Sequence, residues 1–274
     1  MQLIDTHCHL FMEPLATDAA AVRRRAAAAG VGQIVVPAYD TNSWAQVTAL
    51  AADRDPMAEA EQTATVYPAL GLHPWAAAAP LDLARLARAL TDSNAVALGE
   101  IGLDFKVETP AWDQQIGIFE AQLDLARQLE LPVILHNRGA FEEMLTILGR
   151  HVKTGYANRP LQELRGVVHA FSRGPELAQR FIDLGFCIAF GGAITRSRAK
   201  SARRSAESLP LDRIVLETDA PSIGLDGVDP ERTEPRHVTE VAAALAEIRG
   251  ESLQTIQEVT SSNARALFGL PDFS

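Results

Sequence analysis

The sequence predicts a (β/α)8 barrel, the TIM-barrel fold, formed as a single domain over residues 1–274. Its length is close to the ~250 residues typical of that fold. Eight short apolar segments of strand character alternate with segments of helical character along the chain. Residues of the kinds that bind metals or act in catalysis stand at the ends of six of these segments, where such barrels carry their active sites.

The expected strands are apolar runs rich in β-branched and aromatic residues, a composition that suits a pleated, buried surface. Glycine closes some of them, as Gly191 and Gly192 close the seventh. In order, the strands are expected over residues 3–10, 33–37, 66–70, 95–100, 132–136, 166–169, 186–190 and 214–219.

The expected helices repeat apolar residues at spacings of three and four, as Ile116, Phe119 and Leu123 do. Gly30 can stop the first helix. The helices are expected over residues 18–29, 42–52, 81–90, 112–129, 140–148, 176–184, 239–249 and 252–268. The segment 53–65 has no clear assignment, and 151–159 is expected to form an irregular polar connection.

The first strand ends in His7 and His9. Because side chains alternate along a strand, both imidazoles point to the same side, where they can share a metal ion. One such pair could equally be two polar residues at a strand end. Further strands repeat the arrangement, however, and end in His73, Glu100, His136, His169 and Asp219.

Five of the seven histidines thus fall at expected strand ends, whereas random placement would scatter them over helices and loops. A doubly wound open sheet is the main alternative fold. Such a sheet normally gathers its ligands near one switch point, so ligand-type residues at six strand ends favour the closed barrel.

Composition limits the classes of function. A net charge of −10 argues against binding nucleic acid through a broad basic surface, although not against a local site. No apolar run approaches the ~20 residues of a membrane span, and no export signal is evident. Cys8 and Cys187 lie in expected strands without a disulfide framework, so the cytoplasm is the expected location. Nothing indicates an obligate protein partner.

The strand-end residues stand within short motifs that run from residue 3 to residue 269. In order, these are Asp5-Thr6-His7-Cys8-His9, Gly71-Leu72-His73-Pro74, Gly99-Glu100-Ile101-Gly102-Leu103-Asp104, Leu131-Pro132-Val133-Ile134-Leu135-His136 with Arg138, His169-Ala170-Phe171-Ser172, Glu217-Thr218-Asp219-Ala220-Pro221 and Asn263-Ala264-Arg265-Ala266-Leu267-Phe268-Gly269. In kind and in order they resemble the motifs of the TatD family of metal-dependent deoxyribonucleases.

The resemblance implies an amidohydrolase-type barrel with up to two divalent ions, zinc, manganese or magnesium. By similarity, His7, His9 and Asp219 hold one ion. His136 and His169 hold the other, and Glu100 bridges the two. Two such ions can clamp a scissile phosphate and activate a water molecule.

Within that site, Asp219 is the candidate general base, and Glu100 is the second catalytic carboxylate. His73 and Arg138 are expected to contact the substrate or its phosphate, with two alternatives: His73 could only cap its strand, and Arg138 could pair with a neighbouring carboxylate. Asp5 and Glu217 are expected to support the ligands rather than to bind metal. Asn137-Arg138-Gly139 and Thr233 depart from the family pattern on loops that would meet the substrate.

Cleavage of DNA phosphodiester bonds, from single-stranded or frayed ends, is therefore the expected function. The alternative is hydrolysis of a small-molecule ester, amide or phosphoester, and a non-catalytic metal-binding protein is a third class. Three aromatic residues could stack on bases at the barrel mouth or, as easily, pack under the loops, namely Trp75, Phe105 and Phe171. A basic cluster could guide a polyanion, or form a solvated helix start: Arg196, Arg198, Lys200, Arg203 and Arg204.

Overall fold

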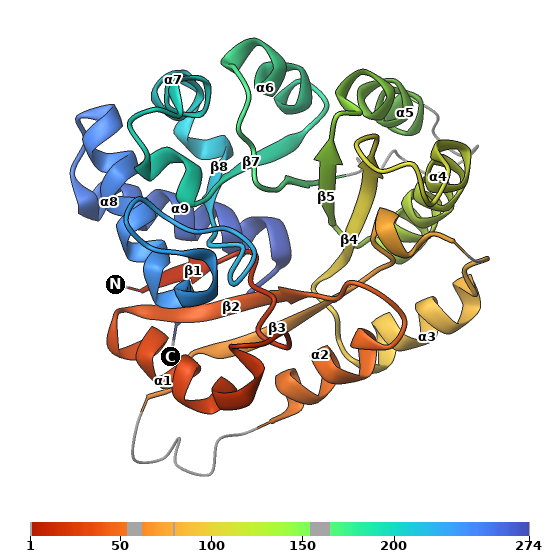
Figure 1. The fold of residues 1–274 in the computed structure, drawn as a ribbon, viewed down its shortest axis with the longest axis horizontal. Coiled ribbons are helices and arrows are strands. Elements are labelled where there is room, and N and C mark those ends of the chain that lie inside the picture. Colours follow the sequence, from red (N-terminus) through yellow and green to blue (C-terminus); the bar gives the residue numbers. More distant parts are fainter. Residues whose placement is uncertain (1, 54–61, 79, 154–164, 274) are drawn as a thin grey trace.

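The structure, a computed structural model, describes residues 2–53, 62–78, 80–153 and 165–273. Eight parallel strands pair in sequence order, each with the next along the chain. Helices surround them on the outside (Figure 1). The predicted (β/α)8 barrel is confirmed.

All eight expected strands are present. They are β1 (Leu3–Asp5), β2 (Val31–Pro37), β3 (Thr65–Leu70), β4 (Ala97–Asp104), β5 (Val133–Arg138), β6 (Gly166–Val168), β7 (Phe186–Phe190) and β8 (Ile214–Leu216). Strands β1 and β8 stop before the polar residues expected at their ends, whereas β4 continues past Glu100 to Asp104. His7 and His9 therefore sit on the segment that leaves β1, and Asp219 sits on the segment that leaves β8.

The expected helices are also present. They are α1 (Ala19–Ala28), α2 (Ser43–Ala52), α3 (Leu83–Asp92), α4 (Trp112–Leu129), α5 (Phe141–Lys153), α6 (Pro175–Ile182), α7 (Lys200–Ser208), α8 (Val238–Arg249) and α9 (Leu253–Phe268). Helix α7 fills the interval between β7 and β8, where no full helix is predicted. The irregular connection predicted over 151–159 is wrong for 151–153, which continue α5, and the rest of it lies outside the described residues. No described helix is both long and apolar enough to cross a membrane.

Alternate residues of each strand face opposite sides, so the barrel has two apolar layers. Outward-facing residues such as Ile34 and Val36 pack with the surrounding helices. Inward-facing residues such as Ile4 and Val35 fill the barrel together with Leu267 and Phe268 of α9. Helix α9 therefore seals one end of the barrel.

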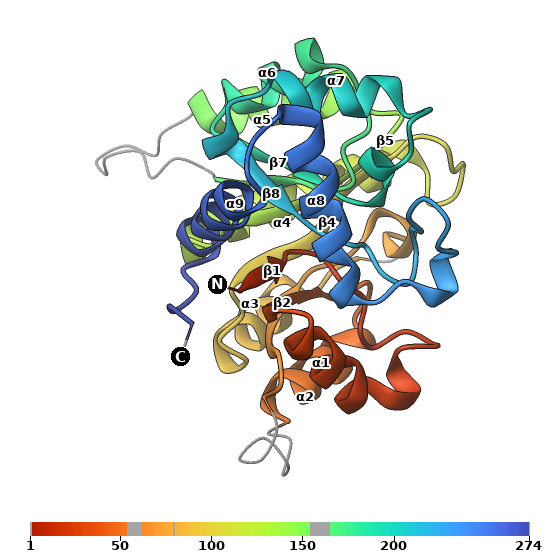
Figure 2. The same cartoon turned by 90° about the vertical axis from the view of Figure 1, so that its left-hand side faces the viewer.

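Hydrogen bonds place α9 at the end where the strands begin. Asn263 donates to the carbonyls of Leu211 and Ile214 at the start of β8, both at 2.8 Å. Ser261 donates to the carbonyl of Gln2, just before β1. The opposite end, where the strands finish, is left to loops, and Figure 2 shows these loops on the far side of the barrel from α9.

The two ends of the sheet meet beyond the hydrogen-bonded strands. The N–H of Thr6 donates to Leu216, and the N–H of Asp219 donates to His7 at 2.8 Å. The N–H of His9 donates to Ala220, also at 2.8 Å. The segment after β1 and the segment after β8 are thus joined by backbone hydrogen bonds, at the very residues expected to bind metal.

Candidate metal and catalytic site

The structure brings all six predicted metal ligands together where the strands finish. Five are buried and His136 is partly buried. Three groups have ligand atoms within 4.8 Å of one another: His7 with His9 and Glu100, His7 with His169 and Asp219, and His73 with Glu100 and His136. The groups overlap, so they form one continuous cluster of imidazoles and carboxylates.

Glu100 lies at the centre of this cluster. Its Oε2 faces His7 Nε2 at 3.3 Å and His9 Nε2 at 3.7 Å. Its Oε1 faces His169 Nε2 at 2.7 Å and His136 Nδ1 at 2.8 Å. Each carboxylate oxygen therefore points at a different set of imidazoles.

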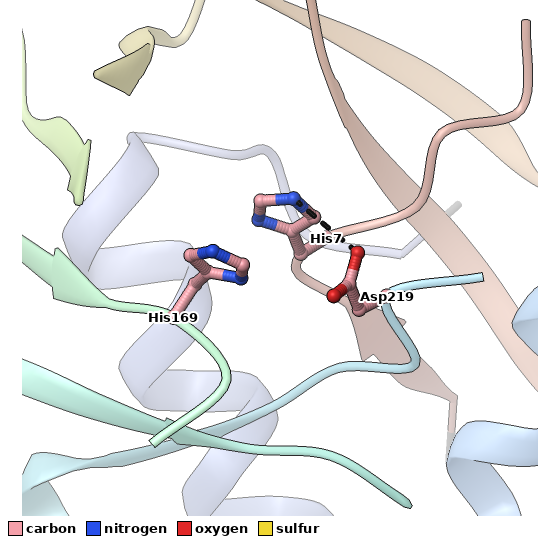
Figure 3. A group of neighbouring side chains, drawn as sticks. All are labelled: His7, His169 and Asp219. Carbon is pink, nitrogen blue, oxygen red and sulfur yellow. Dashed lines mark ion pairs between the residues drawn. The ribbon is translucent and has the colours of Figure 1, made fainter. Parts of the chain in front are cut away.

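Asp219 completes the side of the cluster that holds His7 and His9. Its Oδ1 lies 3.4 Å from His9 Nε2 and 3.8 Å from His7 Nε2. The His7 ring stacks on the His169 ring, with centroids 4.1 Å apart (Figure 3). His7 thereby joins the two sides of the cluster.

Burial and mutual attraction set the charges of the cluster. Burial, aided by His169, lowers the pKa of His7 to about 4. Burial alone would lower the pKa of His169, but the charge of Glu100 raises it to about 10. Burial alone would raise the pKa of Glu100, yet His169, His73 and His7 hold it well below its usual range. Glu100 thus stays ionised because these histidines lie beside it.

The cluster places several nitrogen and oxygen lone pairs against one another, an arrangement that a bound metal ion would stabilise. His7 Nε2 and His9 Nε2 face each other at 3.2 Å, and His136 Nδ1 faces His169 Nε2 at 3.3 Å. Among the described residues, the buried Asp219 Oδ1 finds no hydrogen-bond donor. A cation would give these lone pairs a common partner, and the nitrogen and oxygen donors suit zinc or manganese. The residues present therefore fit a bound metal.

His73, predicted as a substrate contact, lies closer to the cluster than that role requires. Its Nε2 is 3.5 Å from Glu100 Oε1, and its ring stacks on Tyr39. Arg138, also predicted as a substrate contact, ends β5 with a side chain that is 58% exposed. Its Nη1 lies 3.6 Å from Asp104 Oδ2. Arg138 is thus at the rim of the cluster and open to an anion.

Asp104 is a site residue that the sequence prediction did not assign. It is fully buried and accepts hydrogen bonds from the Trp75 indole at 2.7 Å and from the Lys106 N–H at 2.8 Å. Its Oδ2 also lies 3.6 Å from His136 Nε2. The even spacing of four from Glu100 on the same strand could have indicated it, because such residues share a face.

Buried glutamines of α4 hold the loops that carry His73 and Asp104. Gln122 accepts from the N–H of Leu72 and donates to its carbonyl, at 2.8 and 3.1 Å. Gln115, seven residues earlier and on the same helix face, makes the same pair of bonds with Asp104. These contacts fix the backbone on either side of the cluster.

Asp5 and Glu217 contact the backbone beside the ligands, as expected. Asp5 accepts from the N–H groups of His7 and Thr218. Glu217 accepts from the N–H of Ala170 at 2.5 Å and lies 3.9 Å from His169 Nδ1. Neither belongs to the three metal-capable groups found among the described residues.

The remaining expectations are met only in part. Phe171 is buried, so of its two alternatives it packs within the fold and offers no stacking surface. Phe105 is partly buried and stacks on Trp112, whereas Trp75 is 45% exposed. In the basic cluster, Arg196 and Arg203 donate to the backbone carbonyls of Gly224 and Ile194. These two guanidinium groups therefore brace loops.

A metal-capable cluster at the strand-end face of a (β/α)8 barrel defines a metal-dependent hydrolase. The chain belongs to the TatD family, since the family model described as "TatD related DNase" matches residues 4–269. It is similar to the "Uncharacterized metal-dependent hydrolase YjjV" of Escherichia coli, with 38% identity over 274 residues that span 98% of this chain and 99% of that protein.

Three further comparisons agree with this. The "3'-5' ssDNA/RNA exonuclease TatD" of Klebsiella pneumoniae is 33% identical over 212 residues, which span 73% of this chain and 76% of that protein. The crystal structure of Escherichia coli YjjV superposes with a TM-score of 0.87 over 98% of both chains. A TatD family hydrolase from Entamoeba histolytica, 19% identical over 98% of both chains, shares the fold with a TM-score of 0.84.

Proposed function

We propose that this protein cleaves phosphodiester bonds of DNA at single-stranded or frayed ends, using two divalent metal ions. The observation that carries the proposal is the position of Glu100, whose two carboxylate oxygens face two different sets of imidazoles. One carboxylate between two sets of ligands is what a bridged pair of ions requires.

His7, His9 and Asp219 would hold one ion, and His136 and His169 the other, with Glu100 shared. Zinc, manganese and magnesium all accept such donors, the last less readily. When bound, the ions polarise the scissile phosphate and lower the pKa of the attacking water. His73, 3.5 Å from Glu100, is placed to touch either the substrate phosphate or the second group of ligands.

Asp219 serves as the general base in this proposal. Burial alone would raise the pKa of Asp219, but the neighbouring His9, His7 and His169 together lower it, so the carboxylate is ionised and able to accept a proton. Glu100 keeps its charge between the imidazoles and holds them in place. Arg138, exposed at the rim, pairs with a phosphate of the substrate strand.

Single-stranded ends are favoured because the reacting groups are buried at the end of the barrel where the strands finish. A flexible strand end can enter such a mouth, whereas the interior of a duplex is too wide. The named activity of the Klebsiella relative, on single-stranded DNA and RNA, supports this substrate class. The buried, unpaired cysteines Cys8 and Cys187 are consistent with the proposed cytoplasmic location.

A second candidate function is hydrolysis of a small-molecule ester, amide or phosphoester by the same site. The net charge of −10 favours it, as does the use of Arg196 and Arg203 within the fold, which leaves less basic surface for a polyanion. The two candidates share the cluster and differ only in what enters the mouth.

The test is hydrolysis of end-labelled single-stranded DNA by metal-stripped protein, to which zinc, manganese or magnesium is returned. Stepwise shortening that requires metal is expected, and a Glu100→Ala, His136→Ala double variant should lose it. An exposed glutamine on α4 gives a matched control, Gln114→Ala, which should cleave normally. No cleavage by protein that still binds two ions per chain would reject the nuclease and leave the second candidate.

A further inference from the structure

Trp75 has a position that the fold does not require. Among the described residues only three large apolar side chains are exposed, namely Trp75, Trp112 and Leu253. Leu253 begins α9, which seals the opposite end of the barrel. Trp75 follows β3 at the end where the cluster lies, and it is 45% exposed. Leaving an indole open to water gives up the free energy of burying it.

The exposed indole is nonetheless held rigidly. Its N–H donates to Asp104 Oδ2 at 2.7 Å, and its backbone N–H donates to His73 Nδ1 at 3.2 Å. Its ring packs edge-on against the His73 ring, with centroids 4.9 Å apart. An indole whose N–H is already hydrogen-bonded and whose apolar face is exposed can pack against an apolar partner.

That apolar partner would lie next to the reacting groups. The Trp75 ring centroid is 6.1 Å from that of His136, a predicted metal ligand. The carboxylate that anchors the indole also lies 3.6 Å from both His136 Nε2 and Arg138 Nη1. One carboxylate therefore ties together an aromatic surface, a predicted ligand and an exposed guanidinium.

Resting on the proposed nuclease function, we infer that Trp75 is the stacking surface for the unpaired base beside the scissile phosphate. A nucleotide whose phosphate sits at the cluster, with Arg138 on a neighbouring phosphate, carries its base outward toward the indole. Stacking on an aromatic ring is independent of sequence, because every base has a π-face. It requires an unpaired base, so Trp75 selects single strands over duplex DNA.

The first test removes the indole. Trp75→Ala should raise KM for single-stranded DNA by about 5- to 150-fold, the range for loss of one stacked base, with a smaller change in kcat. Trp75→Phe, which keeps an aromatic face, should retain most of the affinity. Trp112→Ala is the matched control, because Trp112 is 49% exposed but stacks on Phe105; its KM should stay near the wild-type value.

Substrates with one abasic position make the assignment specific. For the wild-type protein, an abasic site at one of the two nucleotides flanking the scissile phosphate should cost the same factor as Trp75→Ala. The variant itself should be indifferent to that site. An equal penalty in both proteins would show that the base does not stack on Trp75 and would overturn the inference.

A binding measurement gives a readout that does not depend on cleavage. An oligonucleotide with phosphorothioate linkages should quench the tryptophan fluorescence of the metal-loaded protein, and Trp75→Phe should abolish most of that quenching. Normal cleavage by a Trp75→Ala variant with unchanged KM would sink this inference alone. Absence of cleavage by the wild-type protein would sink the proposed function with it.

Discussion

Asp5 accepts two hydrogen bonds from Thr218, one from its N–H at 2.9 Å and one from its hydroxyl at 2.6 Å. The same carboxylate accepts from the N–H of His7 at 3.2 Å. Asp5 is fully buried. A single side chain thus fixes the backbone next to a predicted ligand on each side of the junction between β1 and β8.

We therefore predict that Asp5→Ala weakens metal binding although Asp5 is not itself a predicted ligand. Loss of a group that orients ligands typically costs 10- to 100-fold in affinity, and a similar loss is expected here. Competition with a chromophoric chelator measures it. Asp5→Asn keeps one acceptor oxygen and should fall between Asp5→Ala and the wild type. Wild-type affinity in the alanine variant would contradict this role.

Removal of metal should lower thermal stability. A ligand that binds only the folded state stabilises it by about 2.7 kcal/mol at 100 times its dissociation constant. For a chain of this size, that corresponds to a fall of about 5–10 °C in Tm when a chelator is added. Calorimetry measures this fall. The Glu100→Ala, His136→Ala variant serves as control and should show a much smaller shift. Equal shifts in both proteins would mean that the metal binds elsewhere.

Gln122→Ala should destabilise the fold more than the substitution of an exposed glutamine on the same helix, α4. It leaves the buried N–H and carbonyl of Leu72 without their partner, at a cost of about 1–3 kcal/mol for each unsatisfied group. Urea unfolding measures the change. Gln128→Ala, at an exposed position of the same helix, is expected to change stability by less than about 0.5 kcal/mol. Similar values for the two variants would refute the bracing role.

Arg249→Ala should lower stability by about 1–3 kcal/mol. Its Nη1 donates to the carbonyls of Ala206, Glu207 and Leu209, which end α7, and its Nε pairs with Glu251. Without the Arg249 side chain, the last carbonyls of α7 lose this hydrogen-bond donor. Arg180, which pairs with Glu142 at the surface, is the comparison, and Arg180→Ala should have no measurable effect. Chemical denaturation of both variants decides the matter.

The fold could be predicted almost entirely because each element carries its own local signal. The run ending in His136 is apolar and β-branched, and α4 repeats its apolar residues with a helical period. The predicted ligands were visible for a related reason. Histidines and carboxylates that end apolar runs must lie at the same end of the barrel, so topology alone brings Glu100 and His136 together.

The rest depends on contacts that no local pattern encodes. Gln115 and Gln122 look like surface residues of α4, and only the loops packed over them reveal that they are buried. Phe171 follows a strand, as Trp75 does, yet the fold covers one and exposes the other. Helix α7 is rich in serine and arginine, so its sequence shows a weak apolar face.

The joining of residues 5–9 to residues 216–220 has a consequence for the newly made chain. The two predicted ligands that follow β1, His7 and His9, cannot meet Asp219 until more than two hundred further residues have been synthesised. Contacts so distant in sequence form late, because closing a long loop is entropically costly. Hydrolytic competence should therefore arrive only with the final closure of the barrel, and a half-made chain should be unable to hydrolyse any substrate.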